Sequence, residues 1–246
     1  MTRLLLALLA LVCAAPTPAP ASPAAEPCRR VEAEGEGYAV CTLDLRRSRV
    51  RLFWRDAEGE AYGSFGRLLR SPAGQGLTFA MNGGMYHPDR SPVGLYVEDG
   101  RELKRANTAS GPGNFHMKPN GVLYVAGDRA GVVETGRYLK LKARPDFATQ
   151  SGPMLVIEGR LHPRISEEGP SRKVRNGVGL RDPHTLVFAI SDGPVTFGAF
   201  ARLFRDALSC RNALFLDGSV SALHAPNLAR TDSWRPMGPI IGALPR

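Results

Sequence analysis

Polar side chains stand beside glycines at several points of this sequence, each time at the end of an apolar run. Two aspartates do so, in Leu216-Asp217-Gly218-Ser219 and in Ser191-Asp192-Gly193. Glycine allows the backbone to approach a ligand closely, and a polar group beside such a turn is well placed to line a cleft. We predict Asp217 as a catalytic nucleophile or general base and Asp192 as a second carboxylate. The alternative is that each Asp-Gly pair only turns the chain.

Amide, guanidinium, ammonium and hydroxyl groups recur in the same setting and could hold an anionic ligand. Asn82 and the two glycine amides after it can donate hydrogen bonds, and the fork of Arg175 suits a phosphate. The residues that we predict to bind the ligand are Asn82, Gly83, Gly84, Lys118, Ser151, Arg175, Asn176, Gly218 and Ser221. The alternatives at these positions are ordinary turns and a solvated basic surface.

Several common catalytic patterns are missing from the sequence. It contains no Gly-x-Ser-x-Gly elbow, no P-loop and no dinucleotide fingerprint. His116 and His224 are the histidines best placed as an acid–base partner, although a single histidine is more often structural. No group of His, Cys, Asp or Glu has clear metal-ligand spacing, so we predict neither a metal nor another cofactor.

The chain is basic, with a formal net charge of +9 over 246 residues. Positive charge can attract nucleic acid, anionic surfaces or phosphate-bearing ligands. The arginines are spread along the chain, and no stretch interleaves basic with aromatic residues. We therefore predict no nucleic-acid partner and a mostly solvated basic surface, with a few arginines reserved for an anionic ligand.

The N-terminus has the pattern of a secretory signal peptide. Arg3 precedes an apolar segment, 4–12, and Ala19-Pro20-Ala21 fits the small-x-small cleavage rule. The apolar segment is too short for a membrane span, which takes about 20 residues. We predict a signal peptide over 1–21, a flexible arm over 22–37 and export of the remaining chain.

Three cysteines, Cys28, Cys41 and Cys210, remain after this cleavage. An exported protein meets an oxidising compartment, so a disulfide is reasonable. Cys28 with Cys41 is the favoured pair, because it would tie the arm to the first strand, but the sequence leaves all three pairings open. Cys210 would then be left over, buried behind the helix that precedes it.

Short apolar segments bounded by turn residues indicate a fold rich in strands. The segments 40–45 and 50–54 are predicted to form one hairpin, and Glu98-Asp99-Gly100 is predicted to turn another. Further strands are expected at 77–81, 122–125, 132–135, 154–157, 178–180, 186–190, 213–216 and 239–244.

Two helices are expected. Residues 64–70 could form a short one, and Thr196 can cap a second, in which Phe197, Phe200, Phe204 and Leu208 recur on one face. We predict an α+β fold over 38–246, a single strand-rich domain with a mixed β-sheet and few helices.

In their order and spacing, the polar motifs resemble those of the phosphodiester glycosidase family. The resemblance runs from about Leu77 to Gly242. It rests on Asn82-Gly83-Gly84-Met85-Tyr86, Lys118-Pro119-Asn120-Gly121-Val122, Gln150-Ser151-Gly152-Pro153-Met154-Leu155, Arg175-Asn176-Gly177-Val178-Gly179 and Leu214-Phe215-Leu216-Asp217-Gly218-Ser219. It implies an exported bacterial hydrolase, periplasmic or secreted, that cleaves the glycosidic bond of a sugar-1-phosphodiester. The family often has Asp-Gly-Gly-Ser-Ser where this chain has Asp217-Gly218-Ser219-Val220-Ser221, so Ser219 replaces the second glycine.

The residues predicted for the site suit this implied reaction. Glycosidic cleavage usually uses one carboxylic acid at the leaving group and one carboxylate at the anomeric carbon. A phosphate monoester is a good leaving group, so one critical carboxylate, Asp217, can suffice while Arg175, Asn82 and Lys118 hold the phosphate. The expected partner is a small-molecule or polymer glycan phosphate. The alternatives are a protein that binds such a glycan or a cell-envelope polymer without cleaving it, and a structural envelope protein that engages acidic polymers.

Overall fold

The central strands of this protein carry apolar side chains on both faces, and the fold buries both. The computed structural model describes residues 26–217, 219–233 and 235–246, so the predicted signal peptide lies outside the described residues. Within them the strands form three sheets, and every strand pairing is antiparallel. The strand-rich fold with few helices is confirmed, but the expected mixed sheet is wrong. Continuous apolar strands are typical of parallel sheets, whereas here antiparallel sheets are covered on both faces.

The strands are arranged in the following spatial orders. The first sheet has β1 (Cys28–Ala33), β2 (Glu36–Asp44), β13 (Thr185–Ser191), β12 (Asn176–Asp182), β14 (Asn212–Phe215), β10 (Met154–Ile157) and β11 (Arg160–Leu161). The second has β16 (Arg230–Thr231), β15 (Leu223–Ala225), β4 (Phe79–Asn82), β17 (Ile240–Pro245) and β3 (Ser48–Phe53). The third has β6 (Arg101–Lys104), β5 (Tyr96–Glu98), β9 (Phe147–Ser151), β7 (Gly121–Ala126) and β8 (Arg129–Glu134).

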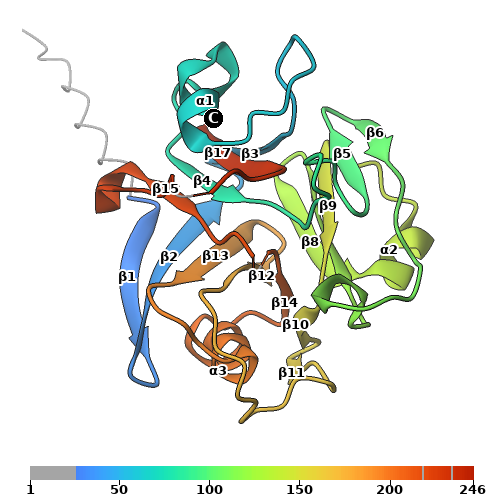
Figure 1. Cartoon of the computed structure of the whole chain (residues 1–246), viewed down its shortest axis with the longest axis vertical. Helices are drawn as coiled ribbons and strands as arrows, with labels where there is room; N and C mark the ends of the chain where they lie inside the picture. The colour runs from blue at the N-terminus through green and yellow to red at the C-terminus, as the bar shows by residue number, and fades with distance from the viewer. Residues whose placement is uncertain (1–25, 218, 234) are drawn as a thin grey trace, which may run out of the picture.

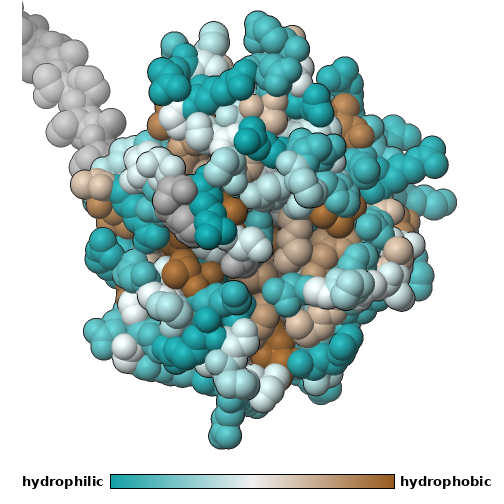
Figure 2. Space-filling model, in the orientation of Figure 1, coloured by the Kyte–Doolittle hydropathy of each residue, from teal (hydrophilic) through white to brown (hydrophobic). Residues whose placement is uncertain are grey.

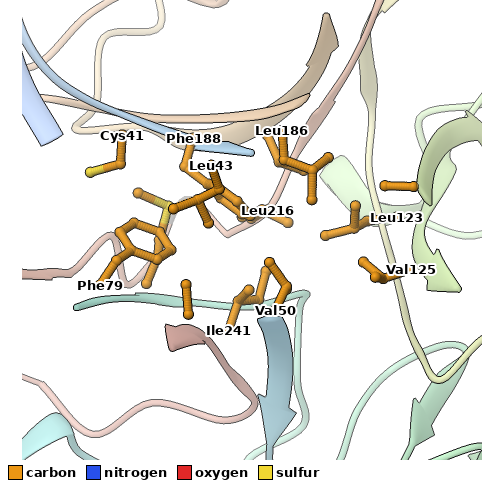
Figure 3. Packing of buried hydrophobic residues seen from close by; sticks show 14 of the residues in the cluster. Cys41, Leu43, Val50, Phe79, Leu123, Val125, Leu186, Phe188, Leu216 and Ile241 are labelled. Carbon is orange, nitrogen blue, oxygen red and sulfur yellow. The ribbon is translucent and has the colours of Figure 1, made fainter. Parts of the chain in front are cut away.

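The inner faces of the three sheets meet in one apolar core. Phe188 of β13 in the first sheet and Phe79 of β4 in the second have their ring centroids 4.9 Å apart. Leu123 and Val125 of β7 point into the same space from the third sheet (Figure 3). The core therefore joins segments that are far apart in the sequence.

A helix covers the outer face of each sheet (Figure 1). On the first sheet, α3 (Phe197–Arg202) continues as a π-helical turn, η3 (Leu203–Ala207); α1 (Phe65–Arg70) packs on the second sheet and α2 (Thr135–Leu141) on the third. Short 3-10 turns lie at η1 (Pro72–Gly74), η2 (Asn114–His116) and η4 (Pro226–Leu228). Among the described residues, no helix has the length and hydropathy needed to cross a membrane.

The predicted helix after Thr196 is confirmed, and two glycines explain how closely it packs. The Thr196 side chain caps α3 by accepting a hydrogen bond from the amide of Ala199 at 3.1 Å. Beneath the helix, a Cβ on Gly179 of β12 would lie 2.7 Å from the Phe204 ring, and one on Gly177 would lie 3.2 Å from the rings of Phe200 and Phe204. These motif glycines therefore serve packing.

The N-terminal segment is more ordered than expected. Residues 28–33 form β1, which pairs with β2 so that Cys28 lies opposite Cys41, and the two are joined in a disulfide. The favoured cysteine pairing is confirmed, whereas a flexible arm is wrong for residues 28–37. Cys210 is free and buried, as expected, and burial raises the pKa of its thiol to about 12.

The hairpin expected between 40–45 and 50–54 is wrong. β2 lies in the first sheet, between β1 and β13, and β3 lies in the second, beside β17. The connection is tight, since the Arg47 amide donates to the carbonyl oxygen of Asp44 at 3.0 Å, but the strands then diverge into different sheets. The hairpin between β5 and β6 is confirmed.

Loss of an aromatic side chain from the central core should lower the free energy of unfolding strongly. Phe188→Ala should lower the free energy of unfolding by about 3–5 kcal/mol, because it opens a cavity between the first and second sheets. Leu103→Ala, at an exposed leucine, should change it by less than about 0.5 kcal/mol. Denaturant unfolding measures both, and similar small losses for the two variants would contradict this account of the core.

A buried histidine predicts a pH dependence of stability. His224 of β15 is 8% exposed and packs near Phe65. A hydrogen bond of 2.8 Å joins its Nδ1 to the hydroxyl of Thr231. Burial lowers its pKa below the usual 6.5. As the pH falls, His224 therefore takes up a proton at a higher pH in the unfolded chain than in the folded chain. The contribution of the neutral ring to the free energy of unfolding is complete above about pH 6.5, and it is lost as the pH drops from there through the lowered pKa.

His224→Gln should make this fall in the free energy of unfolding smaller between pH 7.5 and 5.5. His87→Gln, at an exposed histidine, is the matched control and should follow the wild type. Denaturant melts at a series of pH values measure the difference. Identical pH dependence in wild type and His224→Gln would show that the buried ring does not contribute.

Candidate active site

Two asparagines link the first and second sheets at the place where their strand ends meet. Asn82 ends β4 and Asn176 begins β12. The Nδ2 of Asn176 donates to the Oδ1 of Asn82 at 2.8 Å, and the Oδ1 of Asn176 accepts from the backbone amide of Asp217 at 3.2 Å. The two amide side chains thus hold the backbone of Asp217, which follows β14 after one further residue, Leu216.

The side chain of Asn82 is fixed in one orientation and leaves a donor unused. Its Oδ1 accepts a second hydrogen bond, from the amide of Ala222 at 2.8 Å. Its Nδ2 is buried and has no hydrogen-bond partner among the described residues. A buried donor without a partner carries a desolvation cost, which a ligand oxygen would remove.

Two serines hold the Asp217 loop from either side. The Oγ of Ser221 donates to the carbonyl oxygen of Asp217 at 3.0 Å. The Oγ of Ser151, at the end of β9 in the third sheet, donates to the carbonyl oxygen of Leu216. Both serines are buried, so they position the loop, and all three sheets contribute to it.

Asp217 faces a cleft of about 520 Å³. The cleft is lined by Met85, Gly113, Asn114, Lys173, Asp217, Ser219 and Arg235. The carboxylate is oriented by the backbone amide of Ser219, which donates to its Oδ1 at 2.8 Å. Asp217 is the single carboxylate among the described residues that line the cleft. Figure 2 shows one face of the molecule, on which paler and brown surface near the centre is flanked by teal.

The walls of the cleft are positively charged. Lys173 and Arg235 are both exposed and both line it beside Asp217. Tyr86 lies nearby: burial and then the negative charge of Asp217 raise the pKa of its phenol, which donates to the carbonyl oxygen of Pro236 at 3.0 Å. The cleft therefore places the carboxylate of Asp217 beside the cations Lys173 and Arg235, which can balance the negative charge of a ligand.

Arg175 lies below this surface. Its side chain is almost fully buried, with the guanidinium 3.6 Å from the Phe197 ring centroid. Nε donates to the carbonyl oxygen of Val195 at 3.0 Å and Nη2 to that of Ser171 at 2.8 Å. Burial lowers its pKa to about 10. No ion pair joins this guanidinium to a carboxylate of the described residues.

The two glycines after Asn82 pack the second sheet against its neighbours. The amide of Gly83 donates to the carbonyl oxygen of Pro239 at 2.7 Å. A Cβ on Gly84 would lie 2.5 Å from the carbonyl oxygen of Gln150 in β9, so only glycine allows this approach. Gly218 lies outside the described residues.

Several predicted residues are not brought to the cleft. Asp192 forms ion pairs at 3.1 Å with Arg30 and Arg230, and it does not line the cleft. The Nζ of exposed Lys118 donates to the carbonyl oxygen of Thr108. His116 and His224 contact the Ala109 carbonyl and the Thr231 hydroxyl, and neither lines the cleft.

From the sequence, Lys173 is expected only to add positive charge beside Arg175, as part of the basic cluster that precedes it, and Arg235 is not predicted as a ligand-binding residue. Arg235 follows neither an apolar run nor a glycine turn, so no signal of that kind was available. Within the described part of the chain, no three His, Cys, Asp or Glu side chains are grouped so as to hold a metal ion.

Comparisons with known proteins support a common fold. The catalytic domain of zebrafish N-acetylglucosamine-1-phosphodiester α-N-acetylglucosaminidase, auto-inhibited by its pro-peptide, has a TM-score of 0.63 and 13% identity, over 89% of this chain and 82% of that one. A Burkholderia pseudomallei protein described as exported has a TM-score of 0.57 and 13% identity, over 85% of this chain and 74% of that one. Identity this low shows the fold alone.

Sequence comparison is more specific. The Escherichia coli K12 protein YigE, described as uncharacterized, is 40% identical over 184 residues, which are 74% of this chain and 72% of YigE. Residues 75–242, most of the described chain, match the sequence profile of the phosphodiester glycosidase family. The match spans every motif on which the resemblance rests, and the chain belongs to the phosphodiester glycosidase family.

Proposed function

We propose that this protein is a hydrolase that cleaves the glycosidic bond of a sugar-1-phosphodiester. The observation that carries the proposal is the position of Asp217. Its amide is bound by Asn176, its carboxylate is oriented by Ser219, and it faces a cleft with two cations. The family supplies the reaction class.

In the proposed reaction, Asp217 acts at the anomeric carbon, as nucleophile or as general base toward water. The bond between that carbon and the phosphate oxygen breaks, and the phosphate monoester leaves with the bonding electrons. Because this group leaves as an anion, it needs little protonation, which suits a cleft with a single carboxylate among its described lining residues. Water supplies the hydroxyl of the released sugar.

The phosphate is held by positive charge and by donors. Lys173 and Arg235 flank Asp217, and the unused Nδ2 of Asn82 lies behind the same loop. Arg175, buried without a carboxylate partner among the described residues, adds a positive field from beneath. These positions support a phosphate site on the Lys173 and Arg235 side of the cleft, in place of Lys118.

Export of the protein belongs to the same proposal. A disulfide joins Cys28 and Cys41, and disulfides persist in oxidising compartments. The sequence pattern over 1–21 is that of a signal peptide, and a protein of the same fold is described as exported. A periplasmic or secreted glycan phosphate is then the expected substrate.

Asp217→Asn should lower turnover by about 10²–10⁴-fold while leaving substrate binding largely intact, because it removes the charge and keeps the shape. Release of reducing sugar from a panel of sugar-1-phosphodiesters measures turnover. Asp206→Asn, at an exposed residue paired with Arg205, is the matched control and should keep full activity. An active Asp217→Asn protein would remove this mechanism.

The same substrate panel separates hydrolysis from binding alone. Binding of a sugar-1-phosphodiester by the wild type without turnover would identify a glycan-phosphate binding protein.

Asp192→Asn should retain activity in the same assay, since Asp192 is held in ion pairs away from the cleft. Loss of turnover in this variant would restore Asp192 as the second carboxylate.

Lys173→Ala should lower kcat/KM for a phosphodiester about tenfold, which corresponds to about 1.4 kcal/mol, mainly through KM. The physical reason is loss of a cation beside the phosphate, so the variant should also depend less on salt. Lys140→Ala, at an exposed lysine outside the cleft, is the control. An equal loss on an uncharged aryl glycoside would contradict a phosphate-binding role.

A further inference from the structure

A second hollow adjoins the cleft that Asp217 faces. It has a volume of about 310 Å³, and we call it the Arg90 hollow. Arg235 lines both the cleft and the Arg90 hollow, so the two spaces meet at this residue. The other residues of the hollow that the argument uses are Gly63, Arg90 and Pro236. Its described lining residues include two cations, Arg90 and Arg235, and no carboxylate.

The phenol of Tyr86 connects the two spaces electrostatically. Burial, the largest cause, raises the pKa of this phenol, and the negative charge of Asp217 raises it further. The positive charges of Arg90 and Arg235 lower it. One side chain therefore feels the carboxylate of the cleft and both cations of the Arg90 hollow, which shows that these groups are close neighbours.

Arg90 is placed by a tight turn. Its amide donates to the carbonyl oxygen of His87 at 2.7 Å, and the amide of His87 donates to that of Ser91 at 2.8 Å. The φ angle of Arg90 is +65°, in the left-handed region that side-chain-bearing residues rarely adopt. Such a conformation costs free energy, and it is kept where the surrounding structure enforces it, often at ligand-binding positions.

The opposite wall of the hollow leaves room for the Arg90 guanidinium. A Cβ on Gly63 would lie 2.9 Å from Nη1 of Arg90, so a larger residue would push the guanidinium aside. The carbonyl oxygen of Gly63 accepts from the amide of Met237 at 2.9 Å, and the Tyr86 hydroxyl donates to that of Pro236. These bonds tie the walls together, so the hollow is formed before a ligand enters.

The charge of Arg90 has no counter-ion within the described part of the chain. Its side chain is half-buried and forms no ion pair there. The acids nearest in sequence to the lining residues are engaged elsewhere. Asp89 accepts from the amide and hydroxyl of Ser91, and Asp232 pairs with Arg230 at 3.0 Å. A partly desolvated cation without a counter-ion gains most from an anionic ligand.

We infer that the Arg90 hollow binds a second anionic group of the substrate, carried by the alcohol on the far side of the phosphodiester. This inference rests on the proposed function, in which the sugar lies at Asp217 and its phosphate beside Lys173 and Arg235. The next unit then passes Arg235 and enters the Arg90 hollow. An uncharged unit would leave the cation there without a partner.

The fork of the Arg90 guanidinium suits a phosphate or a carboxylate, each bound through two oxygens. The substrate class is therefore a glycan in which the unit beyond the cleaved phosphodiester carries its own negative charge. A chain of repeated phosphodiesters has this property. Because Arg235 lines both spaces, two anionic groups can flank it when only a short link joins them.

The test is calorimetric binding of three small anions to the purified mature protein. The probes are glycerol 1-phosphate, 3-phosphoglycerate and glycerol 1,3-bisphosphate, which share a three-carbon link. Glycerol 1,3-bisphosphate should bind more than about tenfold more tightly than glycerol 1-phosphate, and the difference should shrink as salt is added. Tighter binding of 3-phosphoglycerate than of the bisphosphate would assign the second group as a carboxylate.

Arg90→Gln should reduce this preference to about twofold or less, because it removes the fork that holds the second group. Gly63→Ala keeps every charge but fills the space beside the guanidinium, so it should lower the preference as well. The matched control is Arg160→Gln, the same change at an exposed arginine of β11, and it should keep the preference. Thermal unfolding confirms that each variant is folded.

A preference that survives in Arg90→Gln would overturn the inference, and so would an equal loss in Arg160→Gln, which would indicate attraction by net charge alone. Equal binding of glycerol 1-phosphate and the bisphosphate by the wild type would also overturn it. The proposed function is judged separately, by turnover of sugar-1-phosphodiesters. An Arg90-dependent preference without any turnover would remove the hydrolase and keep the second anion site, whereas turnover without the preference would do the reverse.

Discussion

The candidate site depends on the hydrogen bond between the side chains of Asn176 and Asn82. Asn176 must donate to one group, the Oδ1 of Asn82, and accept from another, the amide of Asp217. Among side chains of this size, an amide does both and remains neutral when buried. A carboxylate at position 176 could accept but not donate, and an apolar residue would leave the Asp217 amide without its partner.

This constraint ties the chemistry to the fold. Asn82 and Asn176 belong to different sheets, and Ser151 holds the preceding carbonyl from the third. The sheets keep their relative positions because Phe79, Phe188 and Leu123 meet in a shared core. A loop held from three packed sheets has little freedom, which is what a carboxylate that must meet one carbon atom requires.

Much of this site could be predicted because its residues sit where strands end. Asn82, Asn176 and Asp217 each follow or begin an apolar run, and the structure brings them together. The same pattern has a structural role at Lys118-Pro119-Asn120-Gly121. There the Asn120 side chain bonds the Phe115 carbonyl and the Thr135 hydroxyl, so the motif holds a loop of the third sheet. Local sequence cannot separate an amide that positions a ligand from one that positions a loop.

The arrangement of the strands was harder to predict than their existence. Most expected strands are present, but β2 and β3, adjacent in sequence, belong to different sheets. Pairing depends on which faces the core buries, and that is decided by distant segments such as β13 and β17. Arg235 was missed for a related reason, since it reaches the cleft through tertiary packing and no local pattern marks it.

The replacement of the family's second glycine by Ser219 bears on whether the site can act. Ser219 orients Asp217 through its backbone amide, which donates to the carboxylate at 2.8 Å. Any residue except proline supplies that donor, so the substitution leaves the contact in place. What changes is the cleft wall, where a hydroxymethyl group now stands beside Lys173 and Arg235. The altered loop therefore bears on which substrate fits, and it is weak support for a protein that only binds.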